Sequence, residues 1–320
     1  MKDSTRIAVA SRSFSQHPLL REELLSRYSD VLFNDAGTTL SGNGLVQFLK
    51  GRGKAIIALE RIDESVLSLL PELKVVSKYG VGLDMLDLDA MERHSVLLGW
   101  TGGVNKRSVA ELVVSAAIAL LHRLPEANHE VRSGVWRQLR GRQLTGKTAG
   151  IVGCGNIGKD VAVILENFGC RVLAHDILDF PEFYMEHGII PVGLDDLLRE
   201  SDIVTLHLPL NSATRNILDH RRLAVLKKGA ILLNLARGGL VDEAKLKTML
   251  KDGQLAGAAL DVFNHEPPED LELLNMPNMI ATPHIGGSTE EAVIAMGRAA
   301  IQGLDAAGEI DKVVPDYLRI

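Results

Sequence analysis

The sequence predicts an α/β protein with parallel sheets, divided into two domains. Its 320 residues are enough for two separate hydrophobic cores. Short apolar runs alternate with amphipathic segments, a pattern typical of parallel strands joined by helices. This alternation occurs in two series, separated by an apolar, alanine-rich segment at residues 108–124.

The first series predicts five strands with helical segments between most of them. Each expected strand is a short apolar run such as RIAVAS, and a typical helical segment is HPLLREELLSRY. The expected strands are residues 6–11, 30–34, 54–59, 73–80 and 96–100.

Residues 108–124 predict one long helix. The segment is apolar nearly all round, so we expect it to be buried on several sides. Ser108, with Glu111 three residues later, fits a capping box at the helix start. Two interpretations remain open, a core helix and an interface helix in a dimer.

The second series predicts another parallel sheet, followed by one helix (STEEAVIAMGRAAIQGLDAA) and a short tail. The tail is too short for a further domain, so we expect it to pack on the first region. The domains then interleave as residues 1–101 with 288–320, and residues 102–287, with hinges near 101–107 and 285–289. The expected strands are residues 148–152, 170–176, 202–209, 230–236, 255–263 and 278–284.

Composition and charge exclude several classes of protein. A net charge of −6 and a pI near 5.9 argue against nucleic acid or an anionic membrane surface as partner. No apolar run is long enough to span a bilayer, and we expect no signal peptide. Two cysteines and ten scattered histidines show no disulfide or metal-ligand pattern. We therefore expect a cytoplasmic protein without a metal.

The motif GCGNIG at residues 153–158 predicts a dinucleotide site. It follows an apolar strand and opens a helical pattern, the context that distinguishes this fingerprint from a purely structural glycine turn. Gly153 allows the tight turn, Gly155 lets the backbone approach a pyrophosphate, and Gly158 permits close packing of helix on strand. The helix start supplies N–H groups and positive dipole to the phosphates.

Asp176 predicts NAD rather than NADP. It ends the next expected strand, where its carboxylate would accept hydrogen bonds from the adenosine ribose and repel a 2′-phosphate. Ile177 and Leu178 offer no arginine for that phosphate. Cys154, inside the fingerprint, is better interpreted as a small buried side chain than as a redox group.

Polar side chains follow three consecutive late strands. Arg237 follows ILLNLA, Asp261 and Glu266 follow the next apolar run, and His284 follows NMIATP. Because ligands bind beyond the carboxyl ends of parallel strands, we expect these residues to meet at one sheet edge. Alone, each has an ordinary structural interpretation: a surface ion pair, a solvated loop charge, a core histidine or, for Asp261, a turn cap.

Together these residues predict hydride transfer at a hydroxyl-bearing carbon. His284 can take or give the hydroxyl proton, and Glu266 can orient the imidazole and favour its protonated form. Arg237 can bind a substrate carboxylate bidentately and polarise a neighbouring carbonyl. The glycines after Arg237 and His284, Gly286 among them, leave room for nicotinamide and substrate.

A series of motifs in one order carries a family resemblance over residues 54–305. The chain resembles the D-2-hydroxyacid dehydrogenases, most closely the D-3-phosphoglycerate dehydrogenase branch. The motifs are VVSKYGVGLDMLDLDA, GVNKRSVAELV, GKTAGIVGCGNIG, VLAHD, LHLPLNSATRNIL, NLARGGLVDE, ALDVFNHEPP and TPHIGGSTEEA.

The resemblance implies a flavodoxin-like substrate (lid) domain, an NAD-binding Rossmann domain, a homodimer and a small anionic 2-hydroxy or 2-keto acid substrate. It makes Arg237, Glu266 and His284 the catalytic residues. The other positions implied are Val81 and Gly82 for the substrate carboxylate, Asn105 near the substrate, Asn156 and Ile157 for phosphate, Asp176 for ribose, His207, Leu208, Pro209 and Thr214 for the wall around adenosine and the nicotinamide ribose, and Leu235, Ala236, Arg237, Asp261, His284 and Gly286 for the nicotinamide side.

Departures from the family pattern concern the substrate. Lys78 stands where phosphoglycerate dehydrogenases often carry arginine; it could meet an anionic substrate as a point charge only. The motif GWTGG replaces the usual NTPG, and no C-terminal regulatory domain is expected. D-3-phosphoglycerate is the leading substrate, hydroxypyruvate or glyoxylate reduction the alternative. Two alternative hypotheses for the function are an NAD-sensing corepressor and a dehydrogenase of formate or phosphite.

Overall fold

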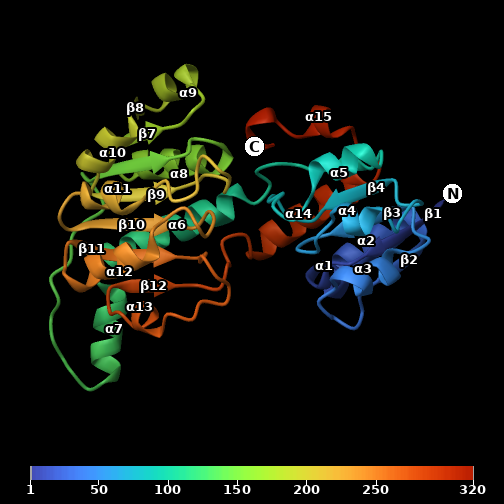
Figure 1. Ribbon diagram of the computed structural model, residues 1–320. Coiled ribbons are helices and arrows are strands. Elements are labelled where there is room, and N and C mark those ends of the chain that lie inside the picture. Colours follow the sequence, from blue (N-terminus) through green and yellow to red (C-terminus); the bar gives the residue numbers. More distant parts are fainter. Residues whose placement is uncertain (1, 320) are drawn as a thin grey trace. The chain divides into compact units, whose positions relative to one another are not determined.

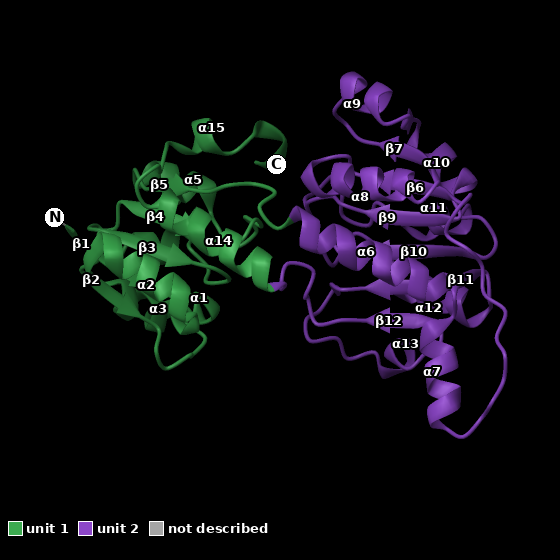
Figure 2. Ribbon diagram, turned by 180° about the vertical axis from the view of Figure 1, so that it is seen from behind, with its two compact units in different colours: residues 1–105, 290–320 green, residues 106–289 purple. Residues whose placement is uncertain are grey.

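The structure, a computed structural model, describes residues 2–319 and divides into two compact units (Figure 2). Unit 1 contains the chain up to Asn105 and from Glu290 onward, and unit 2 contains Lys106–Thr289. The chain thus leaves the first unit once and returns to it. The expected boundaries, after 101 and before 288, lie a few residues before the observed ones.

Unit 1 is built on a five-stranded parallel sheet (Figure 1). Its order, β2-β1-β3-β4-β5, is that of doubly wound flavodoxin-like folds, so helices cover both faces. The strands are β1 (Asp3–Val9), β2 (Tyr28–Phe33), β3 (Lys54–Ile57), β4 (Val75–Lys78) and β5 (Leu97–Gly99).

Alternate residues of these strands enter two cores, one on each face of the sheet. Ala8 packs in a core with α3, α4, α5 and α15, and its neighbours Ile7 and Val9 pack in a core with α1, α2 and α14. The helices are α1 (Arg12–Gln16), α2 (Pro18–Arg27), α3 (Gly42–Leu49), α4 (Glu64–Leu67), α5 (Leu88–Arg93), α14 (Glu290–Gly303), α15 (Ile310–Val313) and the 3₁₀ helix η1 (Asp316–Leu318).

Unit 2 is built on a seven-stranded parallel sheet of order β12-β11-β10-β9-β6-β7-β8. Outward from β6 in both directions this is the Rossmann order, with one added strand at the β12 edge. The strands are β6 (Thr148–Val152), β7 (Arg171–His175), β8 (Ile190–Pro191), β9 (Ile203–Leu206), β10 (Ala230–Asn234), β11 (Leu255–Leu260) and β12 (Met279–Ala281).

Two cores again lie on opposite faces. Ile151 belongs to the core with α6 and α8, and Val152 to the core with α10 and α12, as period-two alternation requires. The helices of unit 2 are α6 (Lys106–Leu121), α7 (Leu124–Arg132), α8 (Asn156–Asn167), α9 (Pro181–Glu186), α10 (Leu194–Glu200), α11 (His220–Ala224), α12 (Glu243–Lys251) and α13 (Leu271–Leu274).

The long central helix differs from its prediction at both ends. It starts at Lys106, so Ser108 lies inside the first turn and does not cap it; the capping box was wrong. It stops at Leu121 because Arg123 adopts the left-handed conformation, and α7 continues at an angle of 62°. No single helix among residues 2–319 is long and apolar enough to cross a membrane, although the bent pair α6 and α7 meets that test by length and composition.

All the expected strands are present, but most are shorter than expected, especially at their carboxyl ends. β9 ends at Leu206, β11 at Leu260 and β12 at Ala281. Beyond these residues each apolar run continues as a loop that no longer pairs with the neighbouring strand. The two-residue strand β8 was not predicted, since it is too short to show a pattern. These early strand ends place the polar residues in loops beyond the sheet.

Candidate active site

The strands of unit 2 end in register at one edge of the sheet. Asn234 pairs with Leu260 and Leu260 with Ala281, so β10, β11 and β12 stop side by side. Val152 pairs with both His175 and Leu206, so β6, β7 and β9 end together too. The strands themselves can be followed in Figure 1. The predicted cofactor and catalytic residues of this unit therefore follow aligned strand ends.

The glycine-rich loop after β6 is tightly packed on one side and open on the other. A Cβ on Gly153 would lie 2.6 Å from the His207 carbonyl oxygen, and one on Gly158 would lie 2.0 Å from that of Gly153. Gly153 also has a φ of +96°. By contrast, a Cβ on Gly155 would have no heavy atom of residues 2–319 within 4 Å. The loop thus leaves space at the glycine predicted to approach the pyrophosphate.

Helix α8 starts directly at this open point. Gly155 is its N-cap, and no side chain of the described residues caps the helix. Asn156 is exposed and Ile157 half-buried in its first turn. Uncapped N–H groups and the positive end of the helix dipole suit the binding of a phosphate, so the loop and helix fit a dinucleotide pyrophosphate.

Asp176 lies one residue past β7 and is held by the glycine-rich loop. Its carboxylate accepts hydrogen bonds from the N–H of Cys154 at 2.5 Å and from the N–H of Leu178 at 2.9 Å. The position fits its predicted ribose contact. The Cys154 side chain is fully buried, and burial, with a smaller effect of Asp176, raises the pKa of its thiol to about 11. A neutral, enclosed thiol supports the structural interpretation of Cys154.

His207 follows β9, and one nitrogen of its ring is buried without a hydrogen-bond partner among the described residues. Its Nε2 lies 3.0 Å from the Thr205 hydroxyl, whereas its Nδ1 has no hydrogen-bond partner among residues 2–319. Burial lowers the pKa of His207 to about 3, so the ring is neutral near pH 7. An unpartnered buried nitrogen is the kind of atom that a hydroxyl of a bound ligand would satisfy.

The loop after His207 is fixed by its own side chains. The Thr214 hydroxyl donates to the Pro209 carbonyl at 2.7 Å and accepts from the Asn211 N–H at 2.9 Å. Leu208, Pro209 and Thr214 are half-buried. These residues form an ordered loop beside the glycine-rich turn, consistent with the predicted wall of a nucleotide site.

Glu266 and His284 meet beyond β11 and β12. Nδ1 of His284 lies 3.3 Å from Oε2 of Glu266, and the two side chains are 51% and 43% exposed. The other carboxylate oxygen of Glu266 accepts from the Phe263 N–H at 3.2 Å. The carboxylate is therefore oriented by the chain, and the pairing leaves Nε2 of His284 for another partner.

The turn carrying Arg237 packs against the loop that leads to Glu266. A Cβ on Gly238 would lie 1.8 Å from the Phe263 carbonyl oxygen, so only glycine permits this approach. The buried Asn234 shapes the turn: its amide donates to the Arg237 carbonyl at 2.8 Å. Leu235 and Ala236 are buried within the same turn. The loops of β10, β11 and β12 thus bring the three predicted catalytic residues to one region.

Asp261 is almost fully buried, with 1% exposure, and its carboxylate accepts three hydrogen bonds from residues 282–286. One of these comes from Gly286, at the predicted nicotinamide side. Its predicted contact with the cofactor remains a prediction, as do those of Leu235, Ala236 and Gly286.

The predicted substrate residues of unit 1 lie at the carboxyl edge of its own sheet. Lys78 ends β4 and is buried; its ammonium donates to the carbonyls of Ala58 at 2.6 Å and Tyr79 at 3.3 Å. The indole of Trp100 donates to the Val81 carbonyl at 3.0 Å, next to Gly82. Asn105 is buried, and its Oδ1 has no hydrogen-bond partner among residues 2–319. Their role in substrate binding remains a prediction.

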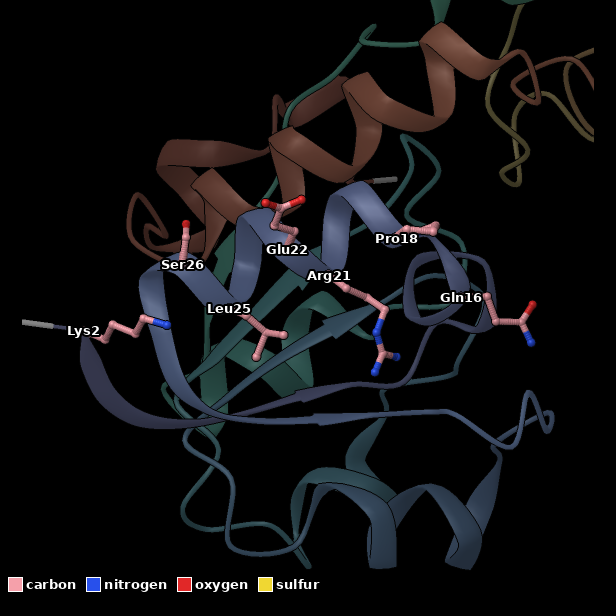
Figure 3. Close-up of a pocket in the computed structure, with 7 residues that line it drawn as sticks. All are labelled: Lys2, Gln16, Pro18, Arg21, Glu22, Leu25 and Ser26. Carbon is pink, nitrogen blue, oxygen red and sulfur yellow. The ribbon is translucent and has the colours of Figure 1, made fainter.

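A surface groove of about 650 Å³ lies along α2 of unit 1 (Figure 3). Its side chains come from that helix, the end of α1 and the amino end of the chain, and no predicted site residue lines it. The lining residues are Lys2, Gln16, Pro18, Arg21, Glu22, Leu25 and Ser26.

Sequence reasoning missed three residues of this region. Asn234 shapes the arginine turn, Thr282 bonds to Asp261, and Ser108 bonds to the histidine loop. Small polar residues such as these carry no signal in the sequence, because their partners lie far along the chain. Among residues 2–319 no group of three or more His, Cys, Asp or Glu side chains could hold a metal ion.

Comparison with known proteins identifies the family of this chain. The family model for "D-isomer specific 2-hydroxyacid dehydrogenase, NAD binding domain" matches residues 114–286, most of unit 2. D-3-phosphoglycerate dehydrogenase of Bacillus subtilis is 39% identical over 234 residues, which are 72% of this chain and 45% of that protein. The chain spans about half the length of the curated relatives it matches.

Solved structures resemble the whole chain. A glyoxylate reductase from Paecilomyes thermophila has a TM-score of 0.84 and 26% identity, covering 95% of this chain and 95% of that one. D-lactate dehydrogenase from Aquifex aeolicus, solved with NAD and lactic acid, has a TM-score of 0.83 and 26% identity, covering 94% and 95%. With an NAD-binding fold, a cradle that fits a dinucleotide and a matching family model, the chain belongs to the D-isomer specific 2-hydroxyacid dehydrogenases.

Proposed function

We propose that this chain transfers hydride between nicotinamide C4 of NAD and C2 of a small D-2-hydroxy or 2-keto acid. The observation that carries the proposal is the Glu266–His284 pair beside the Arg237 turn, on the same sheet edge as the dinucleotide cradle. An acid–base pair, a guanidinium and a nucleotide site together are what this reaction needs.

Each residue has a separate task in the reduction of a keto acid. Bound NADH supplies the hydride. His284, with Nδ1 toward Glu266, donates the proton to the carbonyl oxygen from Nε2. Glu266 keeps the ring oriented, because its own carboxylate is held by the Phe263 N–H. Arg237 binds the substrate carboxylate and polarises the carbonyl.

Two substrates are proposed. D-3-phosphoglycerate leads, because the Bacillus subtilis relative named for that substrate is 39% identical. A smaller keto acid, hydroxypyruvate or glyoxylate, is favoured by Lys78, whose buried ammonium already donates to the carbonyls of Ala58 and Tyr79. An ammonium engaged in this way is poorly placed to bind a phosphate.

Turnover across a panel of keto acids tests the proposal. NADH oxidation would be followed with 3-phosphohydroxypyruvate, hydroxypyruvate, glyoxylate, pyruvate and 2-oxoglutarate, with NADPH in parallel and His284→Ala as reference. Turnover with one keto acid that the variant loses supports the proposal. NADH binding without turnover of any of them counts against the proposal and favours an NAD-sensing binding protein. Turnover that His284→Ala leaves unchanged contradicts the proposed role of His284 as the proton donor.

We also propose a cytoplasmic homodimer formed through α7 and the segment that follows it. Trp136 is 86% exposed, and Leu124, Val131 and Val135 are exposed nearby in sequence. These exposed apolar side chains lie in one segment, residues 124–136, which we call the α7 arm. Such a concentration suits an interface between copies of the chain.

A further inference from the structure

The loop that carries His284 depends on side chains for its shape. It joins the end of β12 at Ala281 to the start of α14 at Glu290, outside any strand or helix. The backbone N–H groups of Ile285 and Gly286 both donate to side-chain oxygens. Two short backbone hydrogen bonds, His284 to Thr282 and Ser288 to Ile285, also lie within the loop, and the side-chain contacts fix its position on the rest of unit 2.

Asp261 holds the loop from beneath. One of its oxygens accepts from the Thr282 hydroxyl at 2.6 Å and from the Ile285 N–H at 2.8 Å. The other accepts from the Gly286 N–H at 2.7 Å. Charge-assisted bonds of this length to a buried carboxylate are strong, and they attach the loop on both sides of His284.

Ser108 holds the same loop from α6. Its hydroxyl donates to the Gly286 carbonyl at 2.6 Å, and its side chain is buried. Gly286 is therefore bonded through both its N–H and its carbonyl, to two different elements of unit 2. A Cβ at this position would lie 3.1 Å from an Asp261 oxygen, so the packing is close.

His284 itself needs this support. Its φ of +56° is in the left-handed region, which is strained for a residue with a Cβ. Without the bonds to Asp261 and Ser108, the loop would be left with its own backbone bonds, from the His284 N–H to the Thr282 carbonyl and from the Ser288 N–H to the Ile285 carbonyl. The imidazole would then move from its place beside Glu266.

We propose that Asp261, Thr282 and Ser108 are positioning residues that hold the His284 loop in its reactive conformation. We call these three residues the loop clamp. The inference rests on the proposed function, since it matters only if His284 transfers the proton. It assigns a role in the reaction to Ser108, which lies on a helix remote in sequence, and to Thr282, which was not predicted to belong to the site.

Two matched pairs of variants test the loop clamp. Ser108→Ala removes a buried hydroxyl that donates to a carbonyl at 2.6 Å, and Ser201→Ala removes an equivalent bond, to Leu197 at 2.6 Å, far along the chain. Thr282→Val removes the hydroxyl at constant shape, and Thr282→Ser keeps it. For each variant we would measure kcat, KM for the keto acid, the NADH dissociation constant and Tm.

The loop clamp predicts that its variants lower kcat without changing the NADH dissociation constant, and by more than their effect on Tm explains. Ser108→Ala and Ser201→Ala should lower Tm similarly, but only Ser108→Ala should lower kcat, by ~10-fold or more, because small displacements of a reacting group are costly. Thr282→Val should lower kcat likewise and Thr282→Ser should restore it. The NADH dissociation constant should stay unchanged in all four variants.

The outcomes separate this inference from the proposed function. If His284→Ala loses turnover while Ser108→Ala and Thr282→Val keep the kcat of Ser201→Ala, the loop clamp is overturned and the proposed function stands. Loss of kcat only together with loss of NADH binding would also overturn it, because the damage would then reach the nucleotide site. If His284→Ala turns over at the wild-type rate, the role of His284 in the proposed function is itself contradicted, and the loop clamp with it.

Discussion

Oε2 of Glu266 lies 3.3 Å from Nδ1 of His284, and its other oxygen accepts from the Phe263 backbone. The carboxylate therefore contacts the imidazole while the chain fixes its own orientation. This relationship leaves Nε2 of His284 available for the proposed proton transfer and leads to the first prediction.

Glu266→Gln should lower kcat by ~10–100-fold, because the amide keeps the shape of the side chain but removes the charge that supports the imidazolium. Steady-state kinetics with the best keto acid would measure the change. Glu269→Gln removes an exposed carboxylate from the same loop and should leave kcat unchanged. Equal effects of both variants would contradict a specific role of Glu266.

Two glycines of the fingerprint should respond differently to alanine. At Gly155 the added Cβ meets no heavy atom of the described chain within 4 Å, so Gly155→Ala should keep Tm and weaken NADH binding by ~10-fold or more. At Gly158 the Cβ would lie 2.0 Å from the Gly153 carbonyl oxygen, so Gly158→Ala should lower Tm as well.

Thermal unfolding and NADH fluorescence titration would measure both effects. Undiminished NADH affinity in Gly155→Ala would contradict the proposed approach of the pyrophosphate to this loop. A Gly158→Ala protein of normal Tm would contradict the close contact of α8 with the glycine-rich turn.

His207 should make stability depend on pH. The unfolded chain binds a proton at this histidine from about pH 6.5 downward, whereas burial delays protonation in the folded chain to about pH 3. The contribution of His207 to the free energy of unfolding is thus present above pH 6.5 and is lost as the pH falls from 6.5 toward 3.

Urea unfolding of wild type, His207→Gln and the exposed-histidine control His220→Gln at pH 8 and pH 5.5 would measure this contribution. The loss of stability between the two pH values should be smaller in His207→Gln than in wild type and unchanged in His220→Gln. Equal losses in all three proteins would show that His207 is not protected from protonation.

Trp136→Ser should weaken the proposed dimer, because it removes the most exposed large apolar side chain of the α7 arm. Light scattering over a range of concentrations would give the molecular mass. Met185→Ser, at another highly exposed apolar position of unit 2, should leave the mass unchanged. A wild-type protein that is monomeric at all concentrations would remove the basis of this prediction.

Features that depend on neighbours along the chain were predictable. The alternation of strands and helices, the turn at Gly153 and the helix start at Asn156 follow from local periodicity and glycine placement. The edge shared by Arg237, Glu266 and His284 was predictable too, because parallel strands end together.

Features that depend on contacts between distant elements required the tertiary structure. The sequence around Ser108 predicts a helix cap, yet its hydroxyl bonds to Gly286, and α6 breaks at Arg123 instead of running on to 124. Asp261 reads as a strand-end residue, and only its burial beneath residues 282–286 reveals three bonds to the histidine loop. Local sequence sets which conformations are accessible, whereas hydrogen bonds between remote segments select one of them, as the bonds of Asp261 and Ser108 to the loop that carries His284 illustrate.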